Sequence, residues 1–138
     1  MQTIEIEFDG GCRPTNPGNK YGSYKVLLDR SEIKSVSEVE LGQGTNNEAE
    51  FETLLQALEW TLGSLKDYGY SPMEYHLRMW TDSTLVRNRI IGRNQTRKSE
   101  PQRRMFDLAA KCLALINQFR SMDILWRSRE HNVATFGH

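Results

Sequence analysis

Residues 4–12 read Ile-Glu-Ile-Glu-Phe-Asp-Gly-Gly-Cys, and this stretch decides where the fold begins. Ile4, Ile6 and Phe8 occupy every second position and acidic residues stand between them. An apolar residue at every second position is typical of a β-strand that buries one face and leaves the other in contact with water. The stretch therefore predicts a first strand that ends at Asp9, where two glycines follow.

Hydrophobic periodicity divides the rest of the chain into further strands and helices. The stretch from Gly10 to Gly22 is rich in Gly, Pro and Asn and predicts a loop. From Asn47 to about Lys66 the period becomes helical, because Leu54, Leu58 and Leu65 fall on one side of a helix. The other predicted elements are strands at 24–28, 33–41, 75–81 and 123–128 and helices at 83–91 and 101–119.

The predicted element order is βββαβααβ, followed by a short tail. This order is an α/β layout with a mixed five-stranded sheet. A chain of 138 residues is the size of one domain and can bury a hydrophobic core without a metal or disulfide. We therefore expect a single domain over residues 1–138.

Composition limits the classes of protein to consider. Hydrophobic residues make up 38% and charged residues 26% of the chain, which is ordinary for a globular protein. No apolar run approaches the roughly 20 residues of a membrane span, and the first residues do not resemble a signal peptide. We expect a cytoplasmic monomer without a membrane partner, in which Cys12 and Cys112 are free thiols.

Three acidic residues stand in separate and distinctive contexts. Asp9 ends the first strand, Glu50 lies near the start of the long helix, and Asp82 follows the strand at 75–81. Carboxylates at the ends of different strands and helices can together hold Mg²⁺, which prefers oxygen ligands. Two such ions can stabilise the attacking and leaving oxygens of a phosphodiester displacement.

Glu50 differs from the other acidic residues of its helix. It lies at the rim of the apolar face, where a carboxylate is unfavourable unless it is paired. A buried salt bridge and a metal ligand are both compatible with this position. Glu48, Glu52 and Glu59 fall on the opposite side, and we expect them to face solvent.

Four motifs in order give the chain a family resemblance. They are Asp9-Gly10-Gly11-Cys12, Asn16-Pro17-Gly18, Thr45-Asn46-Asn47-x-Ala49-Glu50 and Thr81-Asp82-Ser83. Together they make residues 2 to about 132 similar to type 1 ribonuclease H. The resemblance implies the ribonuclease H-like fold, with helices on both faces of a mixed sheet, and endonucleolytic cleavage of the RNA strand of RNA–DNA hybrids.

The resemblance also implies roles for individual residues. Asp9 would bridge two Mg²⁺ ions, for which Mn²⁺ could substitute, and Glu50 and Asp82 would each hold one of them. Asn46 and Asn47, with the backbone of Gly10, Gly11 and Cys12, would contact 2′-hydroxyls and base edges of the hybrid. Side-chain amides suit a 2′-hydroxyl because both groups donate and accept hydrogen bonds.

Asn46, Asn47 and Asn16 also have explanations that involve no substrate. An Asn at a helix start is a common N-cap, the residue that accepts the first free backbone N–H groups, and this could explain one of Asn46 and Asn47. Asn16 and Thr45 would lie near backbone phosphates. For Asn16, within Asn-Pro-Gly, formation of a turn is the alternative.

The C-terminal segment departs from the family pattern. The usual Arg-x-x-Asn is present as Arg129-x-x-Asn132, but Thr135 stands where the fourth acidic residue is expected. Asn132 could fill the fourth metal-ligand position through its carbonyl oxygen. His138 could act instead, or three carboxylates could suffice.

A basic segment interrupts the balanced charge of the chain, which has 18 basic and 18 acidic residues. It could bind phosphates, and Arg93, Arg97 and Lys98 would then hold the DNA strand; a solvated helix face is the alternative. The segment comprises Arg87, Arg89, Arg93, Arg97, Lys98, Arg103 and Arg104, with Glu100 as its one acidic residue.

Two other functions are compatible with these motifs. The chain could be a hybrid-binding module without activity, or another metal-dependent nuclease of the same fold.

Overall fold

The computed structural model describes residues 1–92 and 102–136. They form a mixed five-stranded sheet in the order β3-β2-β1-β4-β5, in which β1 pairs antiparallel with β2 and parallel with β4. The expected mixed sheet is thus confirmed. The elements are β1 (Gln2–Arg13), β2 (Gly18–Leu28), β3 (Ser31–Gly44), α1 (Asn46–Asp67), a short 3-10 helix η1 (Pro72–Glu74), β4 (Tyr75–Thr81), α2 (Thr84–Ile90), α3 (Arg103–Ile116), β5 (Ser121–Trp126) and α4 (Arg129–Phe136).

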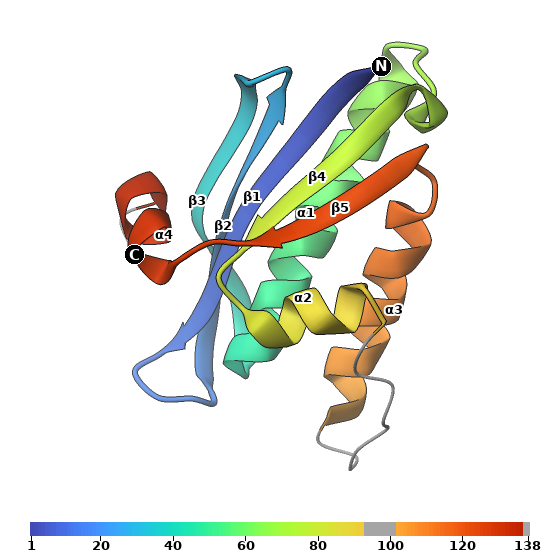
Figure 1. The fold of residues 1–138 in the computed structure, drawn as a ribbon. Coiled ribbons are helices and arrows are strands. Elements are labelled where there is room, and N and C mark those ends of the chain that lie inside the picture. The colour runs from blue at the N-terminus through green and yellow to red at the C-terminus, as the bar shows by residue number, and fades with distance from the viewer. Residues whose placement is uncertain (93–101, 137–138) are drawn as a thin grey trace.

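The two faces of the sheet are covered unequally. Apolar side chains of β1 share one buried cluster with those of α1. Helix α1 packs against β1 and β2, and α3 packs against α1 (Figure 1). On the opposite face, Glu7 lies near His131 of α4, and Lys25 lies over the ring of Phe136 in the same helix. Helices therefore lie on both faces of the sheet, as expected, with α4 near one end of the second face.

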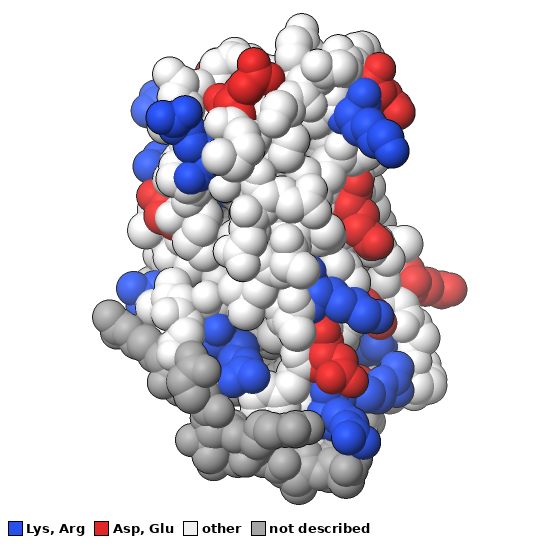
Figure 2. Space-filling model, turned by 90° about the vertical axis from the view of Figure 1, so that its right-hand side faces the viewer, with Lys and Arg blue, Asp and Glu red and all other residues white. Residues whose placement is uncertain are grey.

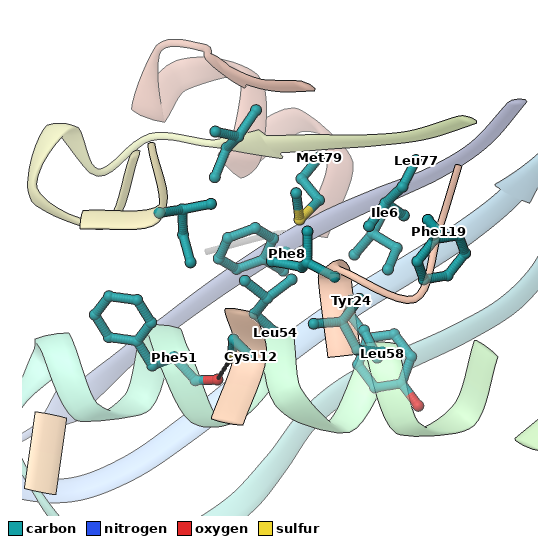
Figure 3. Close-up of a cluster of buried hydrophobic side chains, with 14 of the residues drawn as sticks. Ile6, Phe8, Tyr24, Phe51, Leu54, Leu58, Leu77, Met79, Cys112 and Phe119 are labelled. Atoms are coloured by element: carbon teal, nitrogen blue, oxygen red, sulfur yellow. Dashed lines mark hydrogen bonds between the residues drawn. The ribbon is translucent and has the colours of Figure 1, made fainter. Parts of the chain in front are cut away.

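The hydrophobic core lies between the sheet and the pair α1 and α3. Figure 3 shows Phe8 of β1 lying between Met79 of β4 and Leu54 of α1. Cys112 of α3 is fully buried, and its Sγ donates a hydrogen bond to the backbone oxygen of Phe51 at 3.4 Å. Burial raises the pKa of the Cys112 thiol to about 12, so this side chain acts as a small apolar group. Cys12 and Cys112 are both free thiols.

No helix within residues 1–92 and 102–136 has the length and apolar character needed to span a membrane.

The predicted loop from Gly10 to Gly22 is wrong over most of its length. β1 continues to Arg13 and β2 begins at Gly18, with Gly10 paired opposite Gly22. The glycines that suggested a loop serve close packing instead. A Cβ on Gly10 would lie 2.6 Å from backbone atoms of Ala49, and one on Gly22 would lie 1.9 Å from Thr53 Oγ1. Helix α1 therefore crosses β1 and β2 at two positions where no side chain fits.

The C-terminal tail is the second difference. Residues 129–136 form helix α4, whereas the sequence predicted only a short tail after the last strand. A helix of eight residues with a polar composition gives too little periodicity to be recognised from sequence. The remaining predicted elements exist within a few residues of their expected ends, except that the predicted start of a helix at Pro101 lies outside the described residues.

The contact at Gly10 predicts an asymmetric response to glycine substitution. Gly10→Ala would push α1 away from β1 and should lower the free energy of unfolding by about 1–3 kcal/mol. Gly63, also in α1, is the matched control, because a Cβ there would meet no atom within 4 Å. Gly63→Ala should raise the free energy of unfolding by about 0.5–1 kcal/mol. Urea denaturation of both variants tests this, and equal effects at the two positions would contradict it.

Candidate active site

Three carboxylates from three elements meet at one end of the sheet. Asp9 lies in β1, Glu50 in the first turns of α1, and Asp82 directly after β4. One carboxylate oxygen of each lies within 4.8 Å of the others. Within the described residues this is the one group of three side chains that could hold a metal ion. The sequence motifs that were far apart along the chain thus converge in space.

Helix α1 is fixed at its start by a capping box. Its N-cap is Thr45, whose hydroxyl accepts the backbone N–H of Glu48 at 3.2 Å, while Glu48 Oε1 accepts the backbone N–H of Thr45 at 3.0 Å. Neither Asn46 nor Asn47 is the N-cap, so capping explains neither of them. Glu48 is only 6% exposed, and the prediction that it faces solvent is wrong. The Thr-x-x-Glu spacing of a capping box was the signal that could have revealed this.

Asp82 is held by its neighbours at the end of β4. Its backbone oxygen accepts a hydrogen bond from the indole Nε1 of Trp126 at 3.0 Å. Ser83 is the N-cap of α2, since its Oγ accepts the backbone N–H of Val86 at 3.1 Å. The turn that carries the Asp82 carboxylate is therefore fixed on both sides.

The electrostatics of this cluster suit a bound cation. Burial, and then the nearby charge of Asp82, raise the pKa of Asp9 to about 7, against opposing effects of Arg129 and Asn132. Burial, followed by the charges of Asp9 and Asp82, also raises the pKa of Glu50 well above its usual value. Glu50 Oε2 is buried and makes no hydrogen bond within the described residues. A divalent cation would neutralise the repulsion and provide a ligand partner for this oxygen.

Two residues of α4 complete the surroundings of Asp9. Asn132 is only 2% exposed and its amide lowers the pKa of Asp9. At conventional hydrogen-bond distance and angle, its Nδ2 has no partner among the described residues. A half-turn of the amide would present Oδ1 instead, the atom that a metal would require. Arg129 was not predicted as a site residue, yet its charge lowers the pKa of Asp9.

The residues expected to contact substrate form a connected polar group beside the acids. Asn46 Oδ1 accepts the backbone N–H of Cys12 at 2.9 Å, and Asn16 Oδ1 accepts the backbone N–H of Asn46 at 3.1 Å. The single S–H of Cys12 lies within hydrogen-bond distance of both amide oxygens, with Sγ 3.2 Å from Asn46 Oδ1 and 3.4 Å from Asn16 Oδ1. These contacts leave the NH₂ group of Asn46 pointing away from its fixed oxygen, where it can donate to a ligand.

A cleft of about 330 Å³ joins Glu50 and Asp82 to Cys12 and Asn46 of this polar group. Larger hollows of about 620 and 490 Å³ lie elsewhere, but neither includes any of the three acids, so size does not locate the site. The cleft is lined by Gly10, Gly11, Cys12, Tyr21, Asn46, Asn47, Glu50, Asp82, Ser83 and Arg129.

The basic segment is only partly available to a ligand. Figure 2 shows Lys and Arg side chains gathered on one face beside the residues that are not described. The guanidinium of Arg89 lies 4.0 Å from the centre of the Phe106 ring, and Arg104 pairs with Glu48. The three residues predicted to hold the DNA strand, Arg93, Arg97 and Lys98, lie outside the described residues, as does His138.

Comparison with solved structures identifies the fold. The N-terminal RNase H domain of Rv2228c from Mycobacterium tuberculosis, solved as a fusion with maltose-binding protein, has a TM-score of 0.75 and 26% identity, covering 95% of this chain and 91% of that one. The chain has the ribonuclease H fold. RNase H1 from Halobacterium salinarum NRC-1 (TM-score 0.73, 24% identity, 94% and 89% coverage) and LC11-RNase H1 in complex with an RNA/DNA hybrid (0.71, 24%, 96% and 90%) share it.

Sequence comparison finds the same relative. The bifunctional protein Rv2228c of Mycobacterium tuberculosis is 30% identical over 132 residues, or 94% of this chain. The chain spans about a third of the length of the curated relatives it matches; for Rv2228c the matched part is 32% of that protein. No family model matches this chain. Both comparisons thus lead to Rv2228c, whose N-terminal RNase H domain shares the fold of this chain.

The raised pKa of Asp9 predicts how the stability of the metal-free protein depends on pH. The ordinary pKa of an Asp side chain is 3.8, so between about pH 4 and 7 the folded protein binds more protons than the unfolded chain. The stability contributed by protonated Asp9 is present below pH 4 and is lost as the pH rises to 7. Asp9→Asn should flatten this dependence and raise the free energy of unfolding at pH 8 by roughly 1–3 kcal/mol.

Chemical denaturation in EDTA from pH 4 to 8 measures the effect. If Asp9→Asn showed the same loss of stability with pH as the parent protein, Asp9 would not be the group responsible.

Proposed function

We propose that this protein is an endoribonuclease that cleaves the RNA strand of RNA–DNA hybrids by two-metal-ion hydrolysis. The observation that carries the proposal is the meeting of Asp9, Glu50 and Asp82 within 4.8 Å on a ribonuclease H fold. A structural relative is in complex with an RNA/DNA hybrid, which supports the choice of substrate class.

The three carboxylates would hold the metal ions, with Mg²⁺ as the expected ion and Mn²⁺ as a substitute. When bound, such ions supply Lewis-acid activation and charge neutralisation for phosphodiester hydrolysis. Asp9, on the central strand β1, is the residue proposed to serve both ions. The chain's own contribution is to fix the acids on β1, α1 and the end of β4, so that the ligand oxygens are in place before substrate arrives.

Asn46 and Asn47 would provide selectivity for RNA in the hybrid. Both line the cleft beside Glu50 and Asp82. The Asn46 amide is oriented by its hydrogen bond from Cys12, and its NH₂ group could donate to a 2′-hydroxyl. Asn16 would act mainly by holding the backbone of Asn46, and Thr45 by capping the helix. The backbone of Gly10 and Gly11 would also lie along the RNA strand of the hybrid.

One assay tests the proposal directly. Labelled RNA–DNA hybrid, duplex DNA and duplex RNA are incubated with the protein in Mg²⁺, Mn²⁺ or EDTA. Cleavage of the RNA strand of the hybrid, dependent on metal, is expected. Binding without cleavage would favour a non-catalytic module instead, and cleavage of duplex DNA would favour another nuclease of the same fold.

Asp82→Asn should lower the rate of hybrid cleavage by orders of magnitude with little loss of stability. The substitution keeps the shape of the side chain but removes a charge that the metal ions require. Stability should not suffer, because loss of this charge also relieves repulsion with Asp9 and Glu50. Single-turnover cleavage and thermal unfolding measure the two effects. A cleavage rate near that of the parent protein would show that the site is assigned wrongly.

Substitutions at Asn132 test the fourth ligand position. Asn132→Ala should weaken activity and raise the metal concentration needed, whereas Asn132→Asp should retain or increase activity because it restores a negative charge. Titration of cleavage against metal concentration separates the two variants. Deletion of His138 is the matched comparison: greater damage from the deletion would assign the role to His138. If neither change has an effect, three carboxylates suffice.

A further inference from the structure

Glu48 is an acidic residue whose carboxylate is enclosed at the start of α1. Only 7% of its side chain is exposed, and Oε1 is used by the backbone N–H of Thr45. A Cβ on Gly44 would lie 2.9 Å from Oε1, so the backbone passes close to the carboxylate. Oε2 makes no hydrogen bond within the described residues. Burial of a carboxylate oxygen without a hydrogen bond is unfavourable unless a positive charge lies nearby.

Arg104 supplies that charge from another helix. Its Nε lies 3.3 Å from Glu48 Oε2, although 70% of the Arg104 side chain is exposed. Arg104 lies in the first turn of α3, and Glu48 lies in the first turn of α1. The ion pair therefore ties together the starts of two helices, which elsewhere meet through apolar packing and the hydrogen bond from Cys112 to Phe51.

The first turn of α1 carries the polar side chains of the cleft. Asn46 and Asn47 lie between Thr45 and Glu48, inside the span that the capping box fixes. The backbone N–H of Asn46 is held by Asn16, and its side-chain oxygen is held by Cys12. Any displacement of this turn would change the direction in which both amides point.

We propose that Glu48 and Arg104 are positioning residues that hold Asn46 and Asn47 in the orientation needed to bind substrate. Arg104 belongs by sequence to the basic segment, yet it acts on binding through Glu48 and not as a contact to phosphate. This inference rests on the proposed function, because the readout is the binding of an RNA–DNA hybrid.

Binding is measured in the Asp82→Asn background, in which cleavage is expected to be too slow to disturb the measurement. Arg104→Met and Glu48→Gln should each weaken hybrid affinity by about 2- to 5-fold, a modest effect because Arg104 is largely exposed. Gln can still form the capping box, so Glu48→Gln removes the ion pair without removing the cap. The double variant should bind no more weakly than either single variant, because both changes break one interaction.

Three measurements separate positioning from direct electrostatics. Glu48→Gln removes a negative charge near a polyanion, so general electrostatics predicts tighter binding and the positioning role predicts weaker binding. The slope of log K against log salt should change in Arg104→Met by far less than the about 0.9 expected for each lost phosphate contact. The preference for hybrid over duplex DNA should fall in both variants, since the amides are misdirected. Lys111→Met, an exposed position further along α3, is the control and should change none of these quantities.

Tighter binding by Glu48→Gln, a slope reduced by about 0.9 in Arg104→Met, or additive losses in the double variant would overturn the inference. These outcomes differ from failure of the proposed function. If the parent protein neither binds nor cleaves the hybrid, the function itself is wrong. If the parent protein cleaves hybrid and the variants behave as phosphate contacts do, only the positioning role is wrong.

Discussion

The site depends on how closely α1 can approach β1. At Gly10 the backbone of the helix occupies the space where any other residue would place a Cβ, and at Gly22 the hydroxyl of Thr53 does the same against β2. These two contacts fix the helix along the sheet and across it. Glu50 follows Ala49, the residue that touches Gly10, so the same contact brings its carboxylate to Asp9. The strand, the helix and two of the three acids are thus placed by one steric constraint.

The cluster of acids is unfavourable for the metal-free protein. Burial and mutual repulsion raise the pKa of both Asp9 and Glu50, and one oxygen of Glu50 makes no hydrogen bond within the described part of the chain. The apolar core between the sheet, α1 and α3 stabilises the fold and offsets the unfavourable burial and repulsion of these acids. Strongly perturbed acids in a cleft are typical of functional sites, where a group is held for a ligand and not for the fold. Arg129 and Asn132 of α4 reduce the repulsion only in part.

The number of basic residues between Arg87 and Arg104 overstated how many of them are available to bind a ligand. Arg89 lies against the ring of Phe106 and Arg104 pairs with the enclosed carboxylate of Glu48, so both form contacts within the protein. The same ion pair explains why Glu48, on the polar side of a helical wheel, is enclosed. A wheel describes one helix in isolation, whereas the burial of Glu48 comes from the strand end at Gly44 and from the start of α3.

The sequence by itself determined the order of the strands and helices up to β5, because the alternation in β1 and the helical period of α1 are local patterns that burial enforces. It also singled out Asp9, Glu50 and Asp82, through motifs that are each contiguous. Only the tertiary structure decided that Gly10 and Gly22 lie in strands, since their role is to admit a helix that comes later in the chain. It alone decided that Asn132 lies on a short helix beside Asp9, because α4 is too short and polar to leave a periodic pattern. Distances between residues far apart in the chain are set by packing, and no local pattern contains them.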